Sequence, residues 1–286
     1  MVAVGGRTRW EVGGEPAASR EVRAPAGIVA VEPEDMTVQV RAGTTLADLD
    51  AALAEVGQRT VLEGPDPNRS TVGGTLAVGR SGPRRLGDGP VRDAVLGLTW
   101  ISAEGRRVMA GGATVKTVSG FDLCRLMVGS LGTLGIFAET VLRTRPRADC
   151  SRWLTGPADP IELRRALFAP VSLLWDGRRC WVLLEGHPSD VEHQSGLAAD
   201  LGCRDAGHGP PPLPPHRTSI PPGDLAQMGK ERPGTFVAEM GVGVVHLDHP
   251  RPAAEIDPIV AERCRRVKQA LDPTGRLAPG RTAWPQ

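Results

Sequence analysis

The sequence predicts an α+β fold in two domains, residues 1–147 and 148–286. Strand-like and helix-like segments mix irregularly up to about residue 147, whereas an α/β fold requires them to alternate strictly. The 286 residues suffice for two hydrophobic cores. With 36 glycines and 26 prolines, the composition indicates a loop-rich globular protein rather than a disordered chain. The boundary is expected near residues 146–149, beyond the last strand-like segment of the first half.

The first clear strand is expected over Met36–Ala42, where apolar and polar residues alternate. A helix follows, with Thr45 as its N-cap and Asp48 three residues later as a capping-box variant. Gly57 is expected to end this helix. Its apolar stripe is formed by Leu46, Leu49, Leu53 and Val56.

The rest of the first domain is expected to hold a hairpin, a short helix and a strand. The hairpin covers Val95–Ala110, with a turn at residues 103–105. The short helix covers Gly120–Val128, and Ile136–Leu142 alternates like a strand. The helix is expected to bury Leu123, Leu126 and Met127.

The second domain is expected to contain strands at 181–185 and 236–246 and helices at 189–201 and 257–271. Between them, the proline-rich residues 210–222 are predicted to be a loop.

Composition excludes several classes of function. The net charge of +1 gives no support for nucleic acid or anionic lipid as a partner. No run of 18 apolar residues could span a membrane, and no secretion signal is visible, so a cytoplasmic location is expected. The five cysteines lack a C-x-x-C pair, which argues against iron–sulfur and structural zinc sites and favours buried thiols. Tyrosine is absent and cannot serve as an acid or base.

The densest feature is the glycine-rich stretch Gly111–Ile136, in which Gly129, Gly132 and Gly135 are spaced three apart. Without a Cβ atom, glycine lets the backbone approach a phosphate or a planar ring closely. A Rossmann fingerprint requires a strand, then G-x-G-x-x-G, then a helix. The order here is helix, glycines, strand, so the stretch predicts a different kind of cofactor site.

Further motifs accompany this stretch in a fixed order. They are G-G-R-T at 5–8, T-V-G-G-T-L-A-V-G-R-S-G-P-R-R-L at 71–86, G-G-x-x-V-K-x-V-S-G-F-D-L at 111–123, G-S-L-G-T-L-G-I at 129–136 and D-P-T-G-R-L-A-P-G-R at 272–281. This succession resembles the FAD-binding domain of the vanillyl-alcohol oxidase / p-cresol methylhydroxylase (PCMH) superfamily. Within that superfamily it is most similar to the FAD-binding subunits of bacterial glycolate oxidases. The similarity covers most of residues 1–147 and the last fifteen or so, whereas 150–270 are less diagnostic.

The resemblance implies a PCMH-type FAD-binding domain of two α+β lobes, followed by a smaller α+β substrate (cap) domain. The family's first β-α unit has no counterpart before Gly5, so either the start is expected to be truncated or misassigned, or the N-terminal lobe is expected to be shortened. In relatives the C-terminal segment returns to the flavin, and Ala278 stands here where the family motif has Asn. Relatives that attach FAD covalently use His or Cys. The first histidine here is His187 and the first cysteine, Cys124, lies in a predicted helix, so noncovalent FAD is expected.

The resemblance also assigns FAD-binding residues. Those matching the two pyrophosphate contacts are Gly5, Gly6, Arg7 and Thr8, and then Thr71, Gly73 and Gly74. Those matching the segment beside the isoalloxazine are Ser81, Gly82 and Arg84. Those of the third contact region are Lys116, Ser119, Gly120 and Asp122. Those matching the strand entry beside the adenosine and ribityl groups are Gly129, Gly132, Thr133, Gly135 and Ile136.

Oxidation of a 2-hydroxy acid by a flavin requires a base for the hydroxyl proton and a cation for the carboxylate. His246 is the base candidate, and the alternative is an ordinary histidine at a strand end. The candidate carboxylate clamps are Arg84, Arg217 and Arg281, of which Arg281 has the best claim because it lies in the returning C-terminal segment. The cations Arg263, Arg265, Arg266 and Lys268 are interpreted as a solvated helix face. No metal is predicted, since only His246–His249 offers a histidine pair.

Two hypotheses follow from the resemblance and these candidates. The first is an FAD-dependent oxidoreductase that transfers hydride from a small 2-hydroxy acid, such as glycolate, to flavin N5. Its expected partners are a larger flavin subunit and an iron–sulfur subunit. The second is a non-catalytic scaffold of the same fold that stabilises a catalytic partner.

Overall fold

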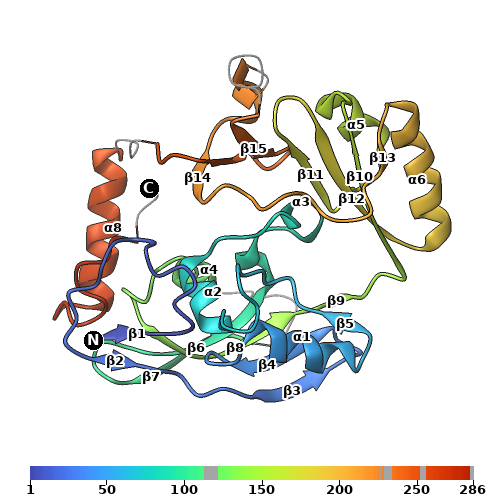
Figure 1. Cartoon of the computed structure of the whole chain (residues 1–286). Helices are drawn as coiled ribbons and strands as arrows, with labels where there is room; N and C mark the ends of the chain where they lie inside the picture. The colour runs from blue at the N-terminus through green and yellow to red at the C-terminus, as the bar shows by residue number, and fades with distance from the viewer. Residues whose placement is uncertain (113–121, 226, 229–233, 252–255, 284–286) are drawn as a thin grey trace. The chain divides into compact units, whose positions relative to one another are not determined.

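The alternating segment at residues 36–42 forms β4 (Thr37–Arg41) of a five-stranded antiparallel sheet in the computed structural model (Figure 1). The structure describes all residues except 113–121, 226, 229–233, 252–255 and 284–286. The predicted hairpin and the strand that follows it are confirmed. The sheet has the order β3 (Ile28–Glu32), β4, β8 (Ile136–Arg143), β6 (Val95–Ile101) and β7 (Arg107–Gly111).

Helices α1 (Leu46–Ala54), α2 (Val72–Val78) and α4 (Leu123–Met127) share one hydrophobic core with this sheet. The Thr45 cap is confirmed, because Thr45 Oγ1 accepts the Asp48 N–H at 3.0 Å. Leu46, Leu49 and Leu53 are buried as expected.

Two of the predicted core residues are exposed instead. Val56 lies beyond the end of α1 and is 39% exposed. Leu126 is 40% exposed, because the short helix α4 buries Cys124 and Met127, three residues apart, on its inner face.

The first compact unit comprises Met1–Gly82, Pro90–Arg147 and Ala254–Gln286. It therefore includes helix α8 (Pro258–Leu271), which the sequence analysis placed in the second domain. Val267 and Leu271 of α8 pack against the core of this unit. This unit also contains two small two-stranded sheets. One pairs β1 (Val2–Ala3) with β2 (Glu21–Val22), and the other pairs β5 (Gln58–Arg59) with β9 (Arg145–Pro146).

The second compact unit comprises Pro83–Gly89 and Ala148–Ala253, and it contains a seven-stranded antiparallel sheet. The sheet order is β13 (Arg204–Asp205), β10 (Cys150–Gly156), β12 (Cys180–Gly186), β11 (Ser172–Trp175), β15 (Phe236–Glu239), β16 (Val244–Leu247) and β14 (His216–Ser219). Helices α3 (Arg85–Asp88), α5 (Pro160–Ala166) and α6 (Pro188–Asp200) belong to this unit. Leu173, Val182 and Leu184 form a core with residues of α5 and α6.

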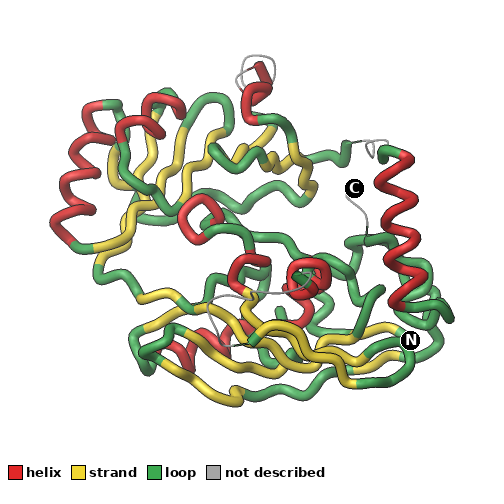
Figure 2. The backbone as a smooth tube through the Cα atoms, turned by 180° about the vertical axis from the view of Figure 1, so that it is seen from behind, coloured by secondary structure: helices red, strands yellow, loops and turns green. Residues whose placement is uncertain are grey.

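The predicted strand over 236–246 is wrong in one respect, because it is a hairpin and not one strand (Figure 2). Strands β15 and β16 are joined by a turn in which Gly241 and Gly243 adopt φ angles of +79° and +77°. Such angles are open to glycine but rare for other residues. The predicted loop 210–222 is also only partly irregular, since it contains the edge strand β14.

Three of the five cysteines are buried as expected: Cys124, Cys180 and Cys203. Burial raises the pKa of each of these three thiols above the ordinary range. Within the described part of the chain, no helix is both long and apolar enough to cross a membrane.

Candidate functional site

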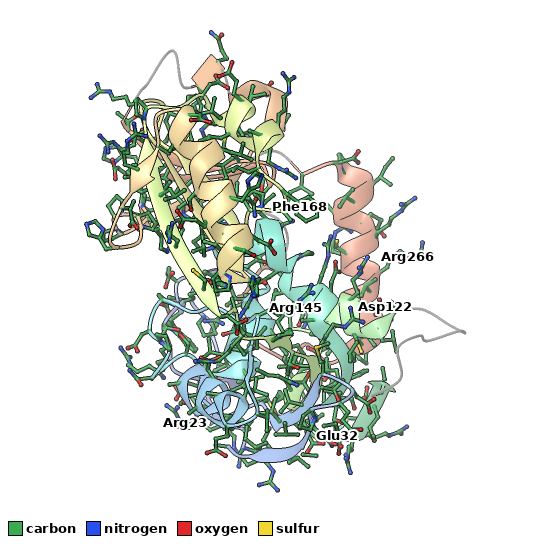
Figure 3. The ribbon with its side chains drawn as sticks, turned by 90° about the vertical axis from the view of Figure 1, so that its right-hand side faces the viewer. Arg23, Glu32, Asp122, Arg145, Phe168 and Arg266 are labelled. Carbon is green, nitrogen blue, oxygen red and sulfur yellow. The ribbon has the colours of Figure 1, made fainter. Side chains whose placement is uncertain are left out.

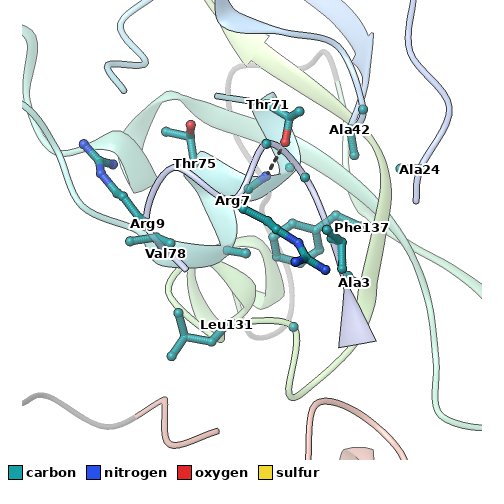
Figure 4. A pocket seen from close by; sticks show the side chains of 18 of the residues that line it. Ala3, Arg7, Arg9, Ala24, Ala42, Thr71, Thr75, Val78, Leu131 and Phe137 are labelled. Carbon is teal, nitrogen blue, oxygen red and sulfur yellow. Dashed lines mark hydrogen bonds between the residues drawn. The ribbon is translucent and has the colours of Figure 1, made fainter. Parts of the chain in front are cut away.

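A pocket in the first unit brings together residues that are far apart in the sequence, among them Val22 at the end of β2 and Ala24 after it (Figure 4). Its wall also includes the loop after β1, the end of β4, the first turns of α2, the segment 131–137 and Arg281. The predicted site residues that line it are Gly5, Gly6, Arg7, Thr8, Thr71, Gly73, Gly74, Gly132, Gly135, Ile136 and Arg281. Sequence reasoning missed other lining residues, among them Arg9, Trp10, Ala42, Leu131 and Phe137.

The loop after β1 offers a run of unpaired backbone donors to this pocket. No described residue accepts a hydrogen bond from the backbone N–H groups of Gly5, Gly6, Arg7 or Thr8. The carbonyl groups are partnered: Arg23 donates to the Gly5 oxygen at 3.1 Å and Arg69 to the Gly6 oxygen at 3.2 Å. Arg7 has a φ of +57°, a turn conformation that can point successive N–H groups to one side. Such a run of donors is suited to an anion.

Two glycines in the wall are required by close packing. A Cβ atom on Gly6 would collide with the backbone carbonyl of Arg69, and one on Gly73 would lie 2.8 Å from the Ala42 Cβ. Gly73 also donates its N–H to the Ala42 oxygen at 2.8 Å, which ties α2 to the end of β4. These glycines therefore allow backbone segments of the protein to meet, and their predicted approach to a cofactor stays a prediction.

The first turn of α2 is already satisfied internally. Thr71 Oγ1 caps it by accepting the Gly74 N–H at 3.1 Å, and the Val72 N–H bonds to the Thr44 oxygen at 2.9 Å. The Gly73 N–H is also used. The free donors for an anion therefore come from the loop at residues 5–8 and not from the start of this helix.

The glycine repeat at residues 129–135 supplies hydrogen-bond donors to the C-terminal end of α2. The Gly129 and Leu131 N–H groups donate to the Leu76 and Ala77 oxygens at 2.9 and 2.8 Å. These carbonyls belong to the last turn of the helix and have no partner within it. Gly135 is needed for packing, because a Cβ atom there would meet Trp100 and Met127.

Arginine side chains and one tryptophan add charge and a flat surface. The Arg281 guanidinium lies 4.2 Å from the centre of the Trp10 ring and donates to the Trp10 oxygen at 2.9 Å. The Arg7 guanidinium lies 4.8 Å from the centre of the same ring. Both arginines therefore make cation–π contacts with Trp10. Burial lowers the pKa of Arg281, and the carboxylates of Glu15 and Glu11 oppose this effect. Arg281 Nε is buried without a hydrogen-bond partner among the described residues.

Several predicted residues do not line the pocket. Ser81 accepts the Val91 N–H at 2.9 Å, and Gly82 packs against Glu63. Asp122 caps α4 by accepting the Arg125 N–H at 2.9 Å, and Thr133 bonds to the Ser130 oxygen at 2.7 Å. Gly129 holds the α2 terminus. These residues make local contacts within the protein, and their predicted contacts with FAD stay predictions. Lys116, Ser119 and Gly120 lie outside the described residues.

Arg84, a predicted carboxylate clamp, is already paired within the second unit. Its guanidinium donates to both oxygens of Glu185, at 2.8 and 2.5 Å, and to Asp88 at 3.2 Å. Burial acts to lower the pKa of Arg84, but the hydrogen bonds and charge of Glu185 and Asp88 raise it above the ordinary value. This bidentate ion pair engages the Arg84 guanidinium within the second unit, and its assignment as a carboxylate clamp stays a prediction.

His246 lies on β16 and is hydrogen-bonded to a buried carboxylate. Its Nε2 is 2.8 Å from Glu239 Oε1, and no other described residue is a hydrogen-bond partner of its ring. Arg217 on β14 is directly opposite His246 in the sheet register. Directly opposite residues of antiparallel strands project from the same face, with Cβ atoms about 5 Å apart. The structure thus brings together two of the predicted residues and adds Glu239, which sequence reasoning missed.

No group of three potential metal-ligating side chains occurs among the residues that the structure describes.

Comparison with known proteins agrees with this geometry. Residues 3–111 match the family model of the FAD binding domain. The chain is 37% identical over 183 residues to glycolate oxidase subunit GlcE of Escherichia coli (strain K12), covering 60% of this chain and 51% of that protein. It is 35% identical over 138 residues to glycolate oxidase subunit GlcD of Bacillus subtilis (strain 168), covering 47% and 29% respectively. It therefore spans about half, or less, of these curated relatives.

A solved structure shows the same fold over nearly the whole chain. Alkyldihydroxyacetonephosphate synthase superposes with a TM-score of 0.71, covering 97% of this chain and 70% of that one, at 14% sequence identity.

Proposed function

We propose that this chain, which carries a PCMH-type FAD-binding domain and has FAD as its cofactor, oxidises a small 2-hydroxy acid. One observation carries the choice of substrate class: His246 and Arg217 are directly opposite each other on one face of the second unit's sheet. A 2-hydroxy acid carries its hydroxyl and carboxylate on neighbouring carbons. A base and a cation on paired strands suit those two groups.

The pocket of the first unit fits the diphosphate of FAD. The unpaired N–H groups of Gly5–Thr8 would donate to the phosphate oxygens, and Arg281 would supply positive charge, whereas Arg7 is ion-paired with Glu21. Bound FAD supplies a hydride acceptor at N5 of its isoalloxazine. With no covalent attachment residue proposed, we expect noncovalent FAD.

The role of each polar residue in the second unit follows from this substrate. His246 would take the proton of the substrate hydroxyl, and Arg217 would hold the carboxylate. Arg84 is not needed, because Glu185 and Asp88 already neutralise it.

The proposal includes assembly with other subunits. Two relatives are named as subunits of glycolate oxidase, GlcE and GlcD. We infer a hetero-oligomer with a larger flavin subunit and an iron–sulfur subunit, located in the cytoplasm. Co-expression of candidate partner subunits with the tagged chain, followed by gel filtration, tests this assembly.

Anaerobic spectroscopy tests the reaction itself. We expect the purified chain to be yellow and acid precipitation to release all of its flavin. Addition of glycolate or lactate, to the chain or to its complex, is expected to bleach the oxidised flavin absorbance. A colourless preparation that releases no FAD on denaturation would contradict the proposal. Bound FAD that no 2-hydroxy acid bleaches, even in the complex, would favour the non-catalytic scaffold instead.

The pocket geometry also changes the predicted role of Arg281. It lines the same pocket as the Gly5–Thr8 loop, so we assign it to the FAD diphosphate rather than to the substrate carboxylate. Arg281→Met is expected to raise the FAD dissociation constant by roughly 10- to 100-fold, the effect of losing a charged hydrogen bond of about 1.5–3 kcal/mol. Quenching of flavin fluorescence on titration into the apoprotein measures this constant.

Arg266→Met is the matched control for this experiment. Arg266 lies exposed on α8, with its side chain directed away from the ribbon (Figure 3). Its replacement is expected to leave FAD binding unchanged. If Arg281→Met instead preserves FAD affinity and raises only the KM for the 2-hydroxy acid, the original assignment to the substrate is correct.

A further inference from the structure

We propose that Glu239 is the positioning residue of His246, and that it holds the imidazole so that Nδ1 is the nitrogen offered to a substrate. The chemistry of this inference rests on the proposed function. Its geometry rests only on the hairpin of the second unit.

The hairpin brings Glu239 and His246 together on one face of the sheet. Val237 is paired with His246 and Glu239 with Val244, so Glu239 and His246 are diagonal neighbours across β15 and β16. Their side chains project from the same face, because residues two apart in a strand share a face. The Nε2–Oε1 separation of 2.8 Å is that of a strong hydrogen bond.

Burial makes this contact unusual. Glu239 is 1% exposed, and its second carboxylate oxygen, Oε2, has no hydrogen-bond partner among the described residues. Ser172 Oγ is also buried and unpartnered, and it lies on the same face, two residues before the Leu174 that pairs with Glu239. An unsatisfied buried carboxylate oxygen is costly and rare in a purely structural role. The buried Glu239 carboxylate beside His246 is therefore better explained by a chemical role.

The hydrogen bond decides which ring nitrogen is free. A carboxylate only accepts hydrogen bonds, so the imidazole proton lies on Nε2 and the lone pair on Nδ1. In the proposed oxidation, Nδ1 would take the hydroxyl proton, and the electron pair of the O–H bond would become the second bond of the new carbonyl. The C2 hydrogen would leave with its two electrons as a hydride, for which bound FAD would supply the acceptor. Glu239 then provides the counter-charge to the imidazolium.

Nitrogen-15 NMR of the FAD-loaded full chain, labelled at histidine, tests the tautomer without any turnover. The chain has six histidines, and the His246 signals are identified as those that disappear in the variant His246→Gln. We expect His246 to carry its proton on Nε2 in the wild type. Glu239→Met removes the acceptor at similar volume and is expected to abolish this preference. Ser172→Ala removes a neighbouring buried hydroxyl instead and is expected to leave the His246 signals unchanged.

Stopped-flow reduction of the flavin by glycolate or lactate provides the second measurement. We expect Glu239→Met to slow reduction by roughly 10- to 100-fold, as for other orienting partners, with little change in the substrate KM. FAD content and circular dichroism confirm that the variant is folded. A proton on Nδ1 in the wild type, or wild-type reduction by Glu239→Met, would overturn the inference. If no 2-hydroxy acid reduces the wild-type flavin, the proposed function fails, and the tautomer alone decides the role of Glu239.

Discussion

Gly6→Ala is expected to raise the FAD dissociation constant by roughly 5- to 150-fold. The new Cβ atom would overlap the backbone carbonyl of Arg69, so the loop at residues 5–8 must move. Overpacking of this kind costs about 1–3 kcal/mol, which corresponds to that change in affinity if the loop relaxes out of its binding geometry. Titration of FAD into the apoprotein measures the constant, and thermal unfolding measures the accompanying loss of stability.

Gly112→Ala is the control for Gly6→Ala. It lies in the same unit and makes the same chemical change, but a Cβ atom there meets nothing within 4 Å. We expect FAD affinity and unfolding temperature close to those of the wild type. Equal loss of affinity in both variants would show that the loop at residues 5–8 does not hold the diphosphate.

Lys268→Met is expected to lower the free energy of unfolding by about 3–5 kcal/mol, because it leaves the charge of the buried Asp272 carboxylate without its ionic partner. Lys268 Nζ donates to Asp272 Oδ2 at 2.5 Å, to the Thr133 oxygen at 2.7 Å and to the Leu277 oxygen at 3.0 Å. The Asp272 side chain is fully buried, at 0% exposure. Without Lys268, its carboxylate stays buried with only the N–H groups of Arg276 and Leu277 as strong donors.

Urea unfolding followed by circular dichroism measures this loss. Arg265→Met is the matched control, since it removes an exposed ion pair with Glu262 on the same helix. Exposed pairs contribute about 0–1 kcal/mol, so little change is expected there. A Lys268→Met variant as stable as Arg265→Met would show that the contacts of Lys268 do not stabilise the fold.

The Lys268 effect should also depend on pH. Burial acts to raise the pKa of Asp272, but the hydrogen bonds from Lys268, Leu277 and Arg276 outweigh it and hold this pKa below its ordinary value. A lowered pKa in the folded state contributes stability above the unfolded value of about 3.9, and this contribution is lost as the pH falls through the folded pKa. The stability gap between the wild type and Lys268→Met should therefore be widest near neutral pH and narrow below about pH 4.

Local patterns in the sequence were sufficient for most of the first unit. The alternation at residues 36–42, the Thr45 cap and the hairpin at 95–110 are decided by neighbouring residues, and all three are confirmed. The match of residues 3–111 to an FAD binding domain was expected from the resemblance of the ordered motifs to a known family. Lys268 shows the limit of such reasoning. Its position in a run of cations predicted a solvated helix face, yet it bonds to Thr133, 135 residues away along the chain.

The sequence by itself determined the cofactor domain of this protein, because glycine motifs record where the backbone must turn or approach closely. Only the tertiary structure decided which side chains those turns bring together. The β15–β16 turn places Glu239 against His246, although a single strand over 236–246 would keep them far apart. The contacts of Arg281 with Trp10 and of Arg84 with Glu185 likewise join residues far apart in the chain. The spacing of apolar residues indicates which face of a single helix or strand is buried. The contacts above instead join helices, strands and loops that are distant in the chain.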